Sequence, residues 1–464
     1  MPVSLIPSRR NVASGEPLSR GKSPPRAEDG RSGRRGNARF TIRPDPQGME
    51  RPPAARPAVA AQAADARQAA ARRAAARPPA RIPDPMISRA ERSHLGDWWW
   101  TVDRALLAGL GTLMTIGLVF LMAGGPPVAE RLGLPTFHFL NRQVMFLVPS
   151  IGLILAVSFL SLRHVRRLAL VTYLIGIVLC VVATKYGPEI KGAHRWIQFG
   201  SIGVQPSEFV KPAFVVLAAW AFAEGARRRD MPGGTLAVML LPMTIVPLIL
   251  QPDFGQTMLL TMVWCCMVFV AGLHWIWVGG LGGAGLLGVG AAYQFLPHVR
   301  DRIHRFLEKE PTENFQGFWS KESFLMGGWF GTGPGEGVAK RHLPDAHTDF
   351  IFSVAGEEFG TLACIGVVLL FAFIVMRGLT LARRSEDIFC RLAITGLTTL
   401  FGLQACINML VNVRLMPAKG MTLPFISSGG SSLISLALGM GFLVALTRRR
   451  PRTALLNRDE GLAR

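Results

Sequence analysis

Long apolar runs alternate with short polar breaks over most of the chain. Each run holds roughly 20 residues, which is the length that crosses the hydrocarbon core of a bilayer as a helix. The ten-residue alternating segments that are typical of a membrane β-barrel do not occur in the sequence. We therefore expect an all-α polytopic membrane protein with ten transmembrane helices, at roughly 104–124, 143–161, 168–185, 206–224, 233–251, 254–271, 274–294, 350–376, 388–411 and 429–447.

Arginine clusters predict the orientation of these spans. The clusters follow spans 2, 4, 8 and 10, so they share one side of the membrane with both termini, and the positive-inside rule makes that side the cytoplasm. Their members are Arg163, Arg166, Arg167, Arg227, Arg228, Arg229, Arg383, Arg384, Arg391, Arg448, Arg449 and Arg450. A large extracytoplasmic loop between helices 7 and 8, at about residues 295–349, is then expected to face the periplasm.

Composition divides the chain into three parts. The 464 residues are 50% hydrophobic and 17% charged, with a net charge of +21. Residues 1–95 hold 19 Lys and Arg against 8 Asp and Glu, and the tail 448–464 holds 6 Arg against 2 acids. We expect a disordered basic cytoplasmic arm (1–95), a membrane domain (96–447) and a basic cytoplasmic tail (448–464). Basic segments beside membrane spans are typical of contact with anionic membrane lipids, and we expect no nucleic acid partner.

The outer loops carry polar residues that an apolar protein would not need. In KGAHRWIQFGSIGVQPSEFVK, between spans 3 and 4, Arg195 is expected at the interface. Glu208 and Lys211 share a helical face at i, i+3 spacing, which allows either a structural ion pair or the wall of a polar cavity. In QPDFGQT, Asp253 is either the N-cap of the sixth span or a residue that faces a substrate.

The loop NVRLMPAKGMTLPFISSGGSS, between spans 9 and 10, contains too many Pro and Gly residues for a continuous helix. Lys419 lies in it, and Ser431 and Ser432 close it. Irregular backbone at membrane depth is tolerated only where it is buried in protein or lines a watery cavity, so this loop is expected to form the floor of a site.

The segment LPDAHTDFIFSVAGEEFG places acids where the eighth span begins. In an extended chain, Asp345, His347 and Asp349 would point the same way and could bind a divalent cation, with Asp345 as the metal ligand. Asp349 could instead be the N-cap of the span. Glu357 and Glu358 follow within the apolar run, where an unpaired charge is costly, so one of them is expected to face a polar interior or an internal partner.

These motifs occur together in one order, and with ten spans they resemble the SEDS (shape, elongation, division and sporulation) family over about residues 100–447. Within it, DAHTDFIF and AKGMTLPFIS are similar to the cell-division branch. The resemblance implies a peptidoglycan glycosyltransferase that polymerises lipid II, an undecaprenyl-pyrophosphate-linked disaccharide pentapeptide. It also implies that Asp349 is the catalytic acid of the HTDF motif and that Lys419 is functionally important. One departure is Ser428, which stands where the family commonly has Tyr.

The chemistry that this resemblance implies needs few groups. A single carboxylate, Asp349, would deprotonate the attacking sugar hydroxyl in an inverting reaction. Lys419 and Arg195, with Lys340 or Arg341, could stabilise the leaving pyrophosphate, directly or with a divalent cation such as Mg²⁺ or Mn²⁺. The other expected substrate-binding residues are Glu208, Lys211, Asp253, His347, Ser431 and Ser432. The sequence contains no phosphate loop or dinucleotide fingerprint, so no nucleotide cofactor is expected.

The expected partners are lipid II, a class B penicillin-binding transpeptidase, other membrane proteins of the division machinery and membrane lipids. The expected location is the bacterial inner membrane at the division septum, with the active face in the periplasm. Three alternatives stay open at this point: a lipid II flippase, an elongation-type polymerase and a non-catalytic division scaffold. Polar residues within spans also suit a translocation path, but their concentration on the outer face favours surface chemistry.

Overall fold

The computed structural model describes residues 94–189, 193–200, 202–228, 230–272, 316–417 and 420–448, with isolated positions at 65–69 and 279–304. The predicted arm (1–95), the tail after Arg448 and the predicted seventh span (274–294) lie largely outside the described residues. So do Lys419 and most of the outer loop before residue 316.

Helices dominate the described part of the chain. Eight of them are long and apolar enough to cross a membrane, and α8 is a shorter apolar helix, so nine of the ten predicted spans have a counterpart. The prediction of an all-α polytopic membrane protein is thereby confirmed. The helices are α2 (His94–Thr101), α3 (Arg104–Arg131), α4 (His138–Ser158), α5 (Leu162–Tyr186), α6 (Pro206–Arg227), α7 (Gly233–Leu250), α8 (Phe254–Val270), α11 (Gln316–Gly327), η1 (Ala339–His342), α12 (Ile351–Glu358), α13 (Gly360–Arg383), α14 (Ile388–Asn412) and α15 (Gly430–Thr447).

Three elements differ from the sequence prediction. Helix α3 continues past residue 124 and through Pro126 and Pro127. The predicted span 350–376 is two helices, because Gly360 takes a φ of +81° and separates α12 from α13. Between α5 and α6 the chain forms a short antiparallel hairpin, β1 (Ile197–Phe199) and β2 (Ile202–Val204), whose turn uses the positive φ of Gly200.

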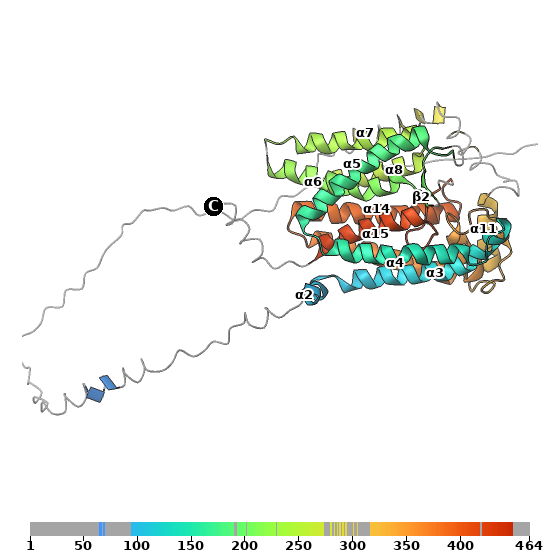
Figure 1. The fold of residues 1–464 in the computed structure, drawn as a ribbon, viewed down its shortest axis with the longest axis horizontal. Helices are drawn as coiled ribbons and strands as arrows, with labels where there is room; N and C mark the ends of the chain where they lie inside the picture. Colours follow the sequence, from blue (N-terminus) through green and yellow to red (C-terminus); the bar gives the residue numbers. More distant parts are fainter. Residues whose placement is uncertain are drawn as a thin grey trace, which may run out of the picture. The chain divides into compact units, whose positions relative to one another are not determined.

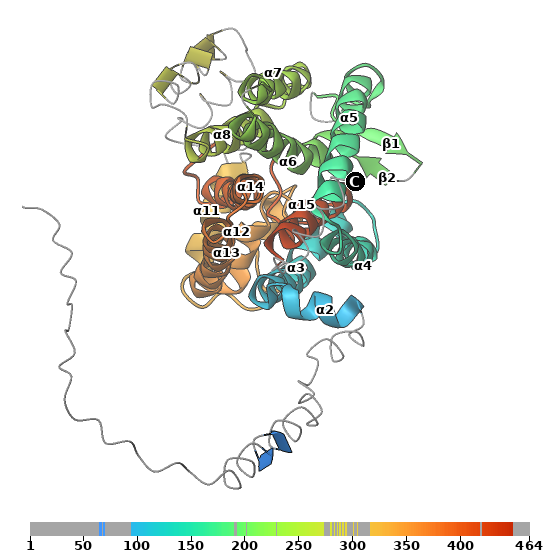
Figure 2. The same cartoon turned by 90° about the vertical axis from the view of Figure 1, so that its left-hand side faces the viewer.

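The spans run side by side, and the two ends of the bundle differ (Figure 1). Helix α2 lies at one end, and α11 and β2 lie at the other. Seen along the helices, α14 and α15 lie inside the group while α7 lies at its edge (Figure 2). Helix α15 packs against α4, α6 and α14, and α14 packs against α6, α8 and α13. Helices α14 and α15, which flank the loop 413–429, are therefore each packed against several other helices.

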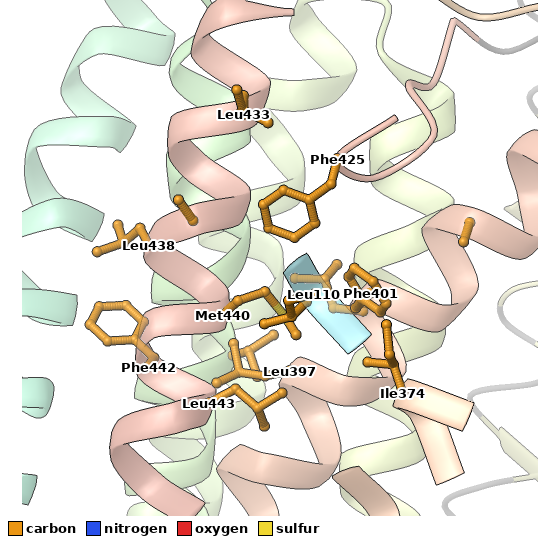
Figure 3. Packing of buried hydrophobic residues seen from close by; sticks show 14 of the residues in the cluster. Leu110, Ile374, Leu397, Phe401, Phe425, Leu433, Leu438, Met440, Phe442 and Leu443 are labelled. Atoms are coloured by element: carbon orange, nitrogen blue, oxygen red, sulfur yellow. The ribbon is translucent and has the colours of Figure 1, made fainter. Parts of the chain in front are cut away.

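A loop residue completes the core between these helices. Phe425, from the loop before α15, is 1% exposed, and its ring centroid lies 6.3 Å from that of Phe401 on α14 (Figure 3). Phe425 has a φ of +62°, which is strained for a bulky residue. The backbone there touches α3 so closely that a β-carbon at Gly117 would lie 2.5 Å from the Phe425 carbonyl oxygen. The loop is thus wedged into the core.

The end of the bundle with the arginine clusters is held by charged and aromatic contacts. Arg227 at the end of α6 pairs with Asp387, the N-cap of α14, at 2.6 Å. The Arg166 guanidinium lies over the Phe389 ring at 4.2 Å. These contacts bring Arg166 and Arg227 to the same end of the bundle, and the assignment of that end to the cytoplasm stays a prediction.

The opposite end is held by two buried acids, Glu357 and Glu358, at the end of α12. The Glu357 carboxylate accepts from the backbone N–H groups of Ala339 (2.7 Å) and Lys340 (2.9 Å). The Glu358 carboxylate forms an ion pair with Lys340 Nζ and accepts from the Gly335 N–H at 3.1 Å. Both acids are at most 1% exposed. The internal partner expected for one of them exists for both, and it is the outer loop 335–340.

We expect Lys340→Met to lower the free energy of unfolding by about 3–5 kcal/mol, because it leaves a buried Glu358 carboxylate without its cation. The double variant Lys340→Met/Glu358→Gln should recover most of the loss, since the glutamine carries no charge and still accepts from Gly335. Unfolding in detergent measures both, with Lys321→Met on the exposed face of α11 as the control. Equal destabilisation in the single and double variants would contradict the ion-pair explanation.

Candidate active site

Asp349 lies in a tight turn at the outer end of the bundle. Residues 344–350 form consecutive turns in which the N–H groups of Thr348 and Phe350 donate to the Asp345 carbonyl. The segment is therefore not extended, so the condition under which Asp345, His347 and Asp349 were expected to point the same way is not met. Phe350 is the residue before α12 and makes no side-chain cap, so the N-cap interpretation of Asp349 is wrong.

Three consecutive backbone carbonyls of this turn are hydrogen-bonded to the opposite wall. The His347 carbonyl accepts from the Ser428 N–H at 2.9 Å, and the Thr348 carbonyl accepts from Ser427 Oγ at 2.6 Å. The Asp349 carbonyl accepts from two amides of α14, Asn408 Nδ2 and Asn412 Nδ2, each at 2.9 Å. These bonds satisfy the carbonyls of a turn that lies outside the helices and strands.

The side-chain amide of Asn408 also contacts the loop that follows α14. Asn408 Nδ2 donates to the Met421 carbonyl at 2.6 Å. A β-carbon at Gly420 would lie 3.7 Å from Asp349 Oδ2, so the carboxylate faces this part of the loop. Gly420 follows Lys419 directly in sequence. The structure thus brings the Asp349 carboxylate beside Gly420, and Lys419 lies outside the described residues.

A buried charged network crosses the bundle next to this site. Lys211 Nζ lies 2.8 Å from Glu208 Oε2 and donates to Gln404 Oε1 at 3.1 Å. Gln404 Nε2 in turn donates to the Thr422 carbonyl, and Gln256 Nε2 donates to the other Glu208 oxygen. The ion-pair interpretation of Glu208 and Lys211 is therefore correct. Both residues also line a cavity with Gln404, but most of its other lining residues are apolar side chains of α14 and α15, so it is not the polar cavity of the alternative interpretation.

Arg195 and Asp253 secure the turn between α7 and α8. The Asp253 carboxylate accepts from the Gln256 N–H at 3.4 Å, which confirms its N-cap role. Arg195 donates to the carbonyls of Gln251 (3.1 Å) and Pro252 (2.6 Å) and lies 3.6 Å from Asp253. Burial raises the pKa of the Asp253 carboxyl, and the Arg195 charge opposes that shift.

The remaining predicted residues lie around the Asp349 turn or the start of α15. The His347 ring packs on Phe139 with centroids 4.0 Å apart. Ser431 Oγ lies 3.4 Å from the Gln205 nitrogen, and Ser432 Oγ lies 2.9 Å from Thr422 Oγ1. These contacts give the serines structural partners. Their predicted contact with a substrate is not tested by the structure.

The described residues do not fit a metal centre made of protein ligands alone. Asp345 accepts from Gln316 Nε2 at 3.1 Å. Within the described ranges, no group of three or more His, Cys, Asp or Glu is arranged to hold a metal ion. The divalent cation therefore stays a prediction from the sequence.

Several residues of the site were not predicted. Asn408 and Asn412 hold the Asp349 carbonyl, and Ser427 holds the carbonyl before it. The two asparagines stand at i, i+4 spacing in an apolar helix, so they share a face, and that spacing was a usable signal. Ser427 donates to the Thr348 carbonyl, 79 residues away in sequence, and no local sequence pattern predicts that contact.

Known proteins resemble this chain over the whole membrane domain. The family model of the FtsW, RodA and SpoVE cell cycle proteins matches residues 104–451. A protein of Caulobacter vibrioides named probable peptidoglycan glycosyltransferase FtsW is 44% identical over 365 residues, covering 78% of this chain and 94% of that protein. A protein of the same name from Trichlorobacter lovleyi is 34% identical, covering 77% and 96%.

Solved structures agree. A chain described under "Structural coordination of polymerization and crosslinking by a peptidoglycan synthase complex" matches with a TM-score of 0.63 and 28% identity, covering 75% of this chain and 97% of that one. The rod shape determining protein RodA of Thermus thermophilus matches with a TM-score of 0.57 and 27% identity, covering 76% and 99%.

The raised pKa of Asp253 predicts a pH dependence. A buried carboxyl with a raised pKa stabilises the fold while it is protonated, and that contribution is lost as the pH rises through the raised value. Asp253→Asn keeps the cap but cannot ionise. We expect it to match the wild type at about pH 4 and to become the more stable protein toward about pH 8 in detergent unfolding. Asp230→Asn, in the exposed turn between α6 and α7, serves as the control. A difference that is constant with pH would contradict the assignment.

Proposed function

The chain belongs to the FtsW/RodA/SpoVE family of cell cycle proteins, and from that membership we propose that it polymerises lipid II with Asp349 as the general base. It is an integral membrane protein and a peptidoglycan glycosyltransferase. The observation that carries the proposed role of Asp349 is its position. The half-buried carboxylate faces Gly420 at the outer end of the bundle, while the backbone behind it is held by α14 and the loop 421–428.

The proposed step is an inverting displacement at the anomeric carbon of one sugar. A hydroxyl of the second sugar attacks that carbon, and its proton passes to the Asp349 carboxylate. The bond between the anomeric carbon and the pyrophosphate oxygen breaks, and the lipid pyrophosphate leaves with the electron pair. A turn whose carbonyls are fixed from behind keeps the base within reach of the hydroxyl, which is the geometric requirement for such catalysis.

The leaving pyrophosphate needs positive charge near Asp349. Lys419 is the proposed source, because its neighbour Gly420 lies beside the Asp349 carboxylate. Lys340, which the sequence offered as an alternative, is 3% exposed and paired with Glu358, so it is not available to a substrate. The Arg195 guanidinium is bonded to the turn 251–253, which favours a structural role for it.

The proposed setting is the bacterial inner membrane at the division septum, with both termini in the cytoplasm. The proposed partners are lipid II, a class B penicillin-binding transpeptidase and other membrane proteins of the division machinery. The description of the matching structure as a peptidoglycan synthase complex supports an assembly with a crosslinking enzyme. The names of the matching relatives support the division role over an elongation role.

Removal of the proposed base tests the mechanism. We expect Asp349→Asn to lower glycan synthesis by about 10²–10⁴-fold, since the amide has the size of the carboxylate but cannot take up the proton. The measurement is glycan formation from labelled lipid II in detergent with the cognate transpeptidase, where transport across a membrane has no meaning. Asp230→Asn makes the same chemical change at the opposite end of the bundle and should retain full activity. Undiminished synthesis by Asp349→Asn would rule out the general base, and a flippase would show no synthesis in any variant.

The division role makes a separate prediction. Depletion of the protein should produce filamentous cells, because septal wall synthesis fails while elongation continues. Microscopy of a depletion strain measures this. Rounded cells would instead indicate the elongation role.

A further inference from the structure

On the basis of the proposed function, we infer that Asn412 is a positioning residue for Asp349 and that it links the position of the base to the outer helix α11. The inference rests on the bonds that the Asn412 side chain and carbonyl make to four different parts of the chain. Asn412 is the last residue of α14 and is fully buried.

Both polar atoms of the Asn412 side-chain amide are hydrogen-bonded. Its Nδ2 donates to the Asp349 carbonyl at 2.9 Å and to the Asn408 carbonyl at 2.9 Å. Its Oδ1 accepts from the Ser353 N–H at 3.0 Å and from Ser353 Oγ at 2.6 Å. One planar group therefore joins Asp349, two residues before α12, to Ser353 in the first turn of α12, and it fixes the orientation of that helix relative to α14.

The backbone carbonyl of Asn412 extends the link outward. Ser320 Oγ on α11 lies 2.5 Å from this carbonyl oxygen and 2.6 Å from Ser353 Oγ. Ser320 and Ser353 are both fully buried. Helix α11 belongs to the outer loop, so a displacement of α11 would be transmitted through Ser320 to Ser353 and to Asn412, which holds the Asp349 carbonyl.

An ordinary helix-end role does not account for these bonds. A residue at the end of a helix usually satisfies carbonyls of its own last turn. Asn412 makes one such bond, to Asn408, but its other partners lie 59 to 92 residues away in sequence. Removal of the amide should therefore disturb the Asp349 turn more than it disturbs α14.

The consequence for catalysis is specific. The Asn412 side chain touches the backbone of Asp349 and is too deeply buried to contact a substrate. Loss of the Asn412 side chain should make the position of Asp349 less well defined without removing a substrate contact. A displacement of a catalytic group by about 1 Å can lower the rate by about 10²-fold. We expect kcat to fall and the KM for lipid II to change little.

The test variant is Asn412→Asp, which retains the oxygen that accepts from Ser353 but loses the N–H that donates to Asp349. We expect kcat to fall at least about tenfold with KM within about twofold of the wild type. Hydrogen exchange at Thr348 and Phe350 should become faster in the same variant, since the turn loses an anchor. Thr395→Val is the matched control: it lies on α14, is buried and removes only a bond to Arg391 within that helix. It should leave both readouts unchanged.

Ser320→Ala provides a milder test that keeps every bond to Asp349. We expect about a threefold fall in kcat and faster exchange at Thr348, and these results decide the question if Asn412→Asp does not fold. Unchanged exchange at Thr348 and Phe350 in a folded Asn412→Asp protein would overturn the inference, as would an equal effect of Thr395→Val. A wild-type protein that makes no glycan would refute the proposed function instead, while the exchange measurements would still decide the role of Asn412.

Discussion

The structure depends on one constraint: polar backbone inside a bilayer protein must find its hydrogen-bond partners within the chain. The turn 344–350, which carries Asp349, lies outside the helices, so its carbonyls lack helical partners. Those of His347, Thr348 and Asp349 are taken up one after another by Ser428, Ser427 and the two α14 asparagines. The bonds that make the irregular backbone tolerable are therefore the same bonds that fix the position of the carboxylate.

The buried charges extend the same principle to side chains. Glu357 and Glu358 neutralise and bind the loop 335–340, and Glu208 and Lys211 pair beside the cavity between α6, α14 and α15. Such pairs contribute little net stability when compared with apolar replacements, but each partner is costly once the other is removed. Such pairs favour one conformation over others. A buried carboxylate is stable only when the outer loop adopts the arrangement that supplies its hydrogen-bond donors.

The sequence was sufficient for the parts of the fold that follow from local patterns. Run length predicted the spans, and the arginine clusters predicted that Arg166 and Arg227 share one side, which their contacts with the start of α14 agree with. The prediction from the sequence was wrong or incomplete where the structure depends on contacts between residues far apart in the chain. The break before α13 depends on Gly360, whose β-carbon would lie 2.4 Å from the Gly331 nitrogen and the Trp329 carbonyl oxygen. No local pattern reveals that approach. The partners of Glu357 and Glu358 were unpredictable for the same reason, while the i, i+4 pair Asn408 and Asn412 was visible but unexplained.

The same arrangement gives the proposed base a fixed position. The Asp349 carbonyl is anchored to the buried helix α14, while the half-buried carboxylate faces the Gly420 loop. That loop is itself wedged in place by Phe425, held at a positive φ between α3 and α14. We interpret the strained backbone of Phe425 as a consequence of holding the Gly420 loop rigid opposite the proposed base. The packing of the core is thereby linked to the geometry of the proposed reaction.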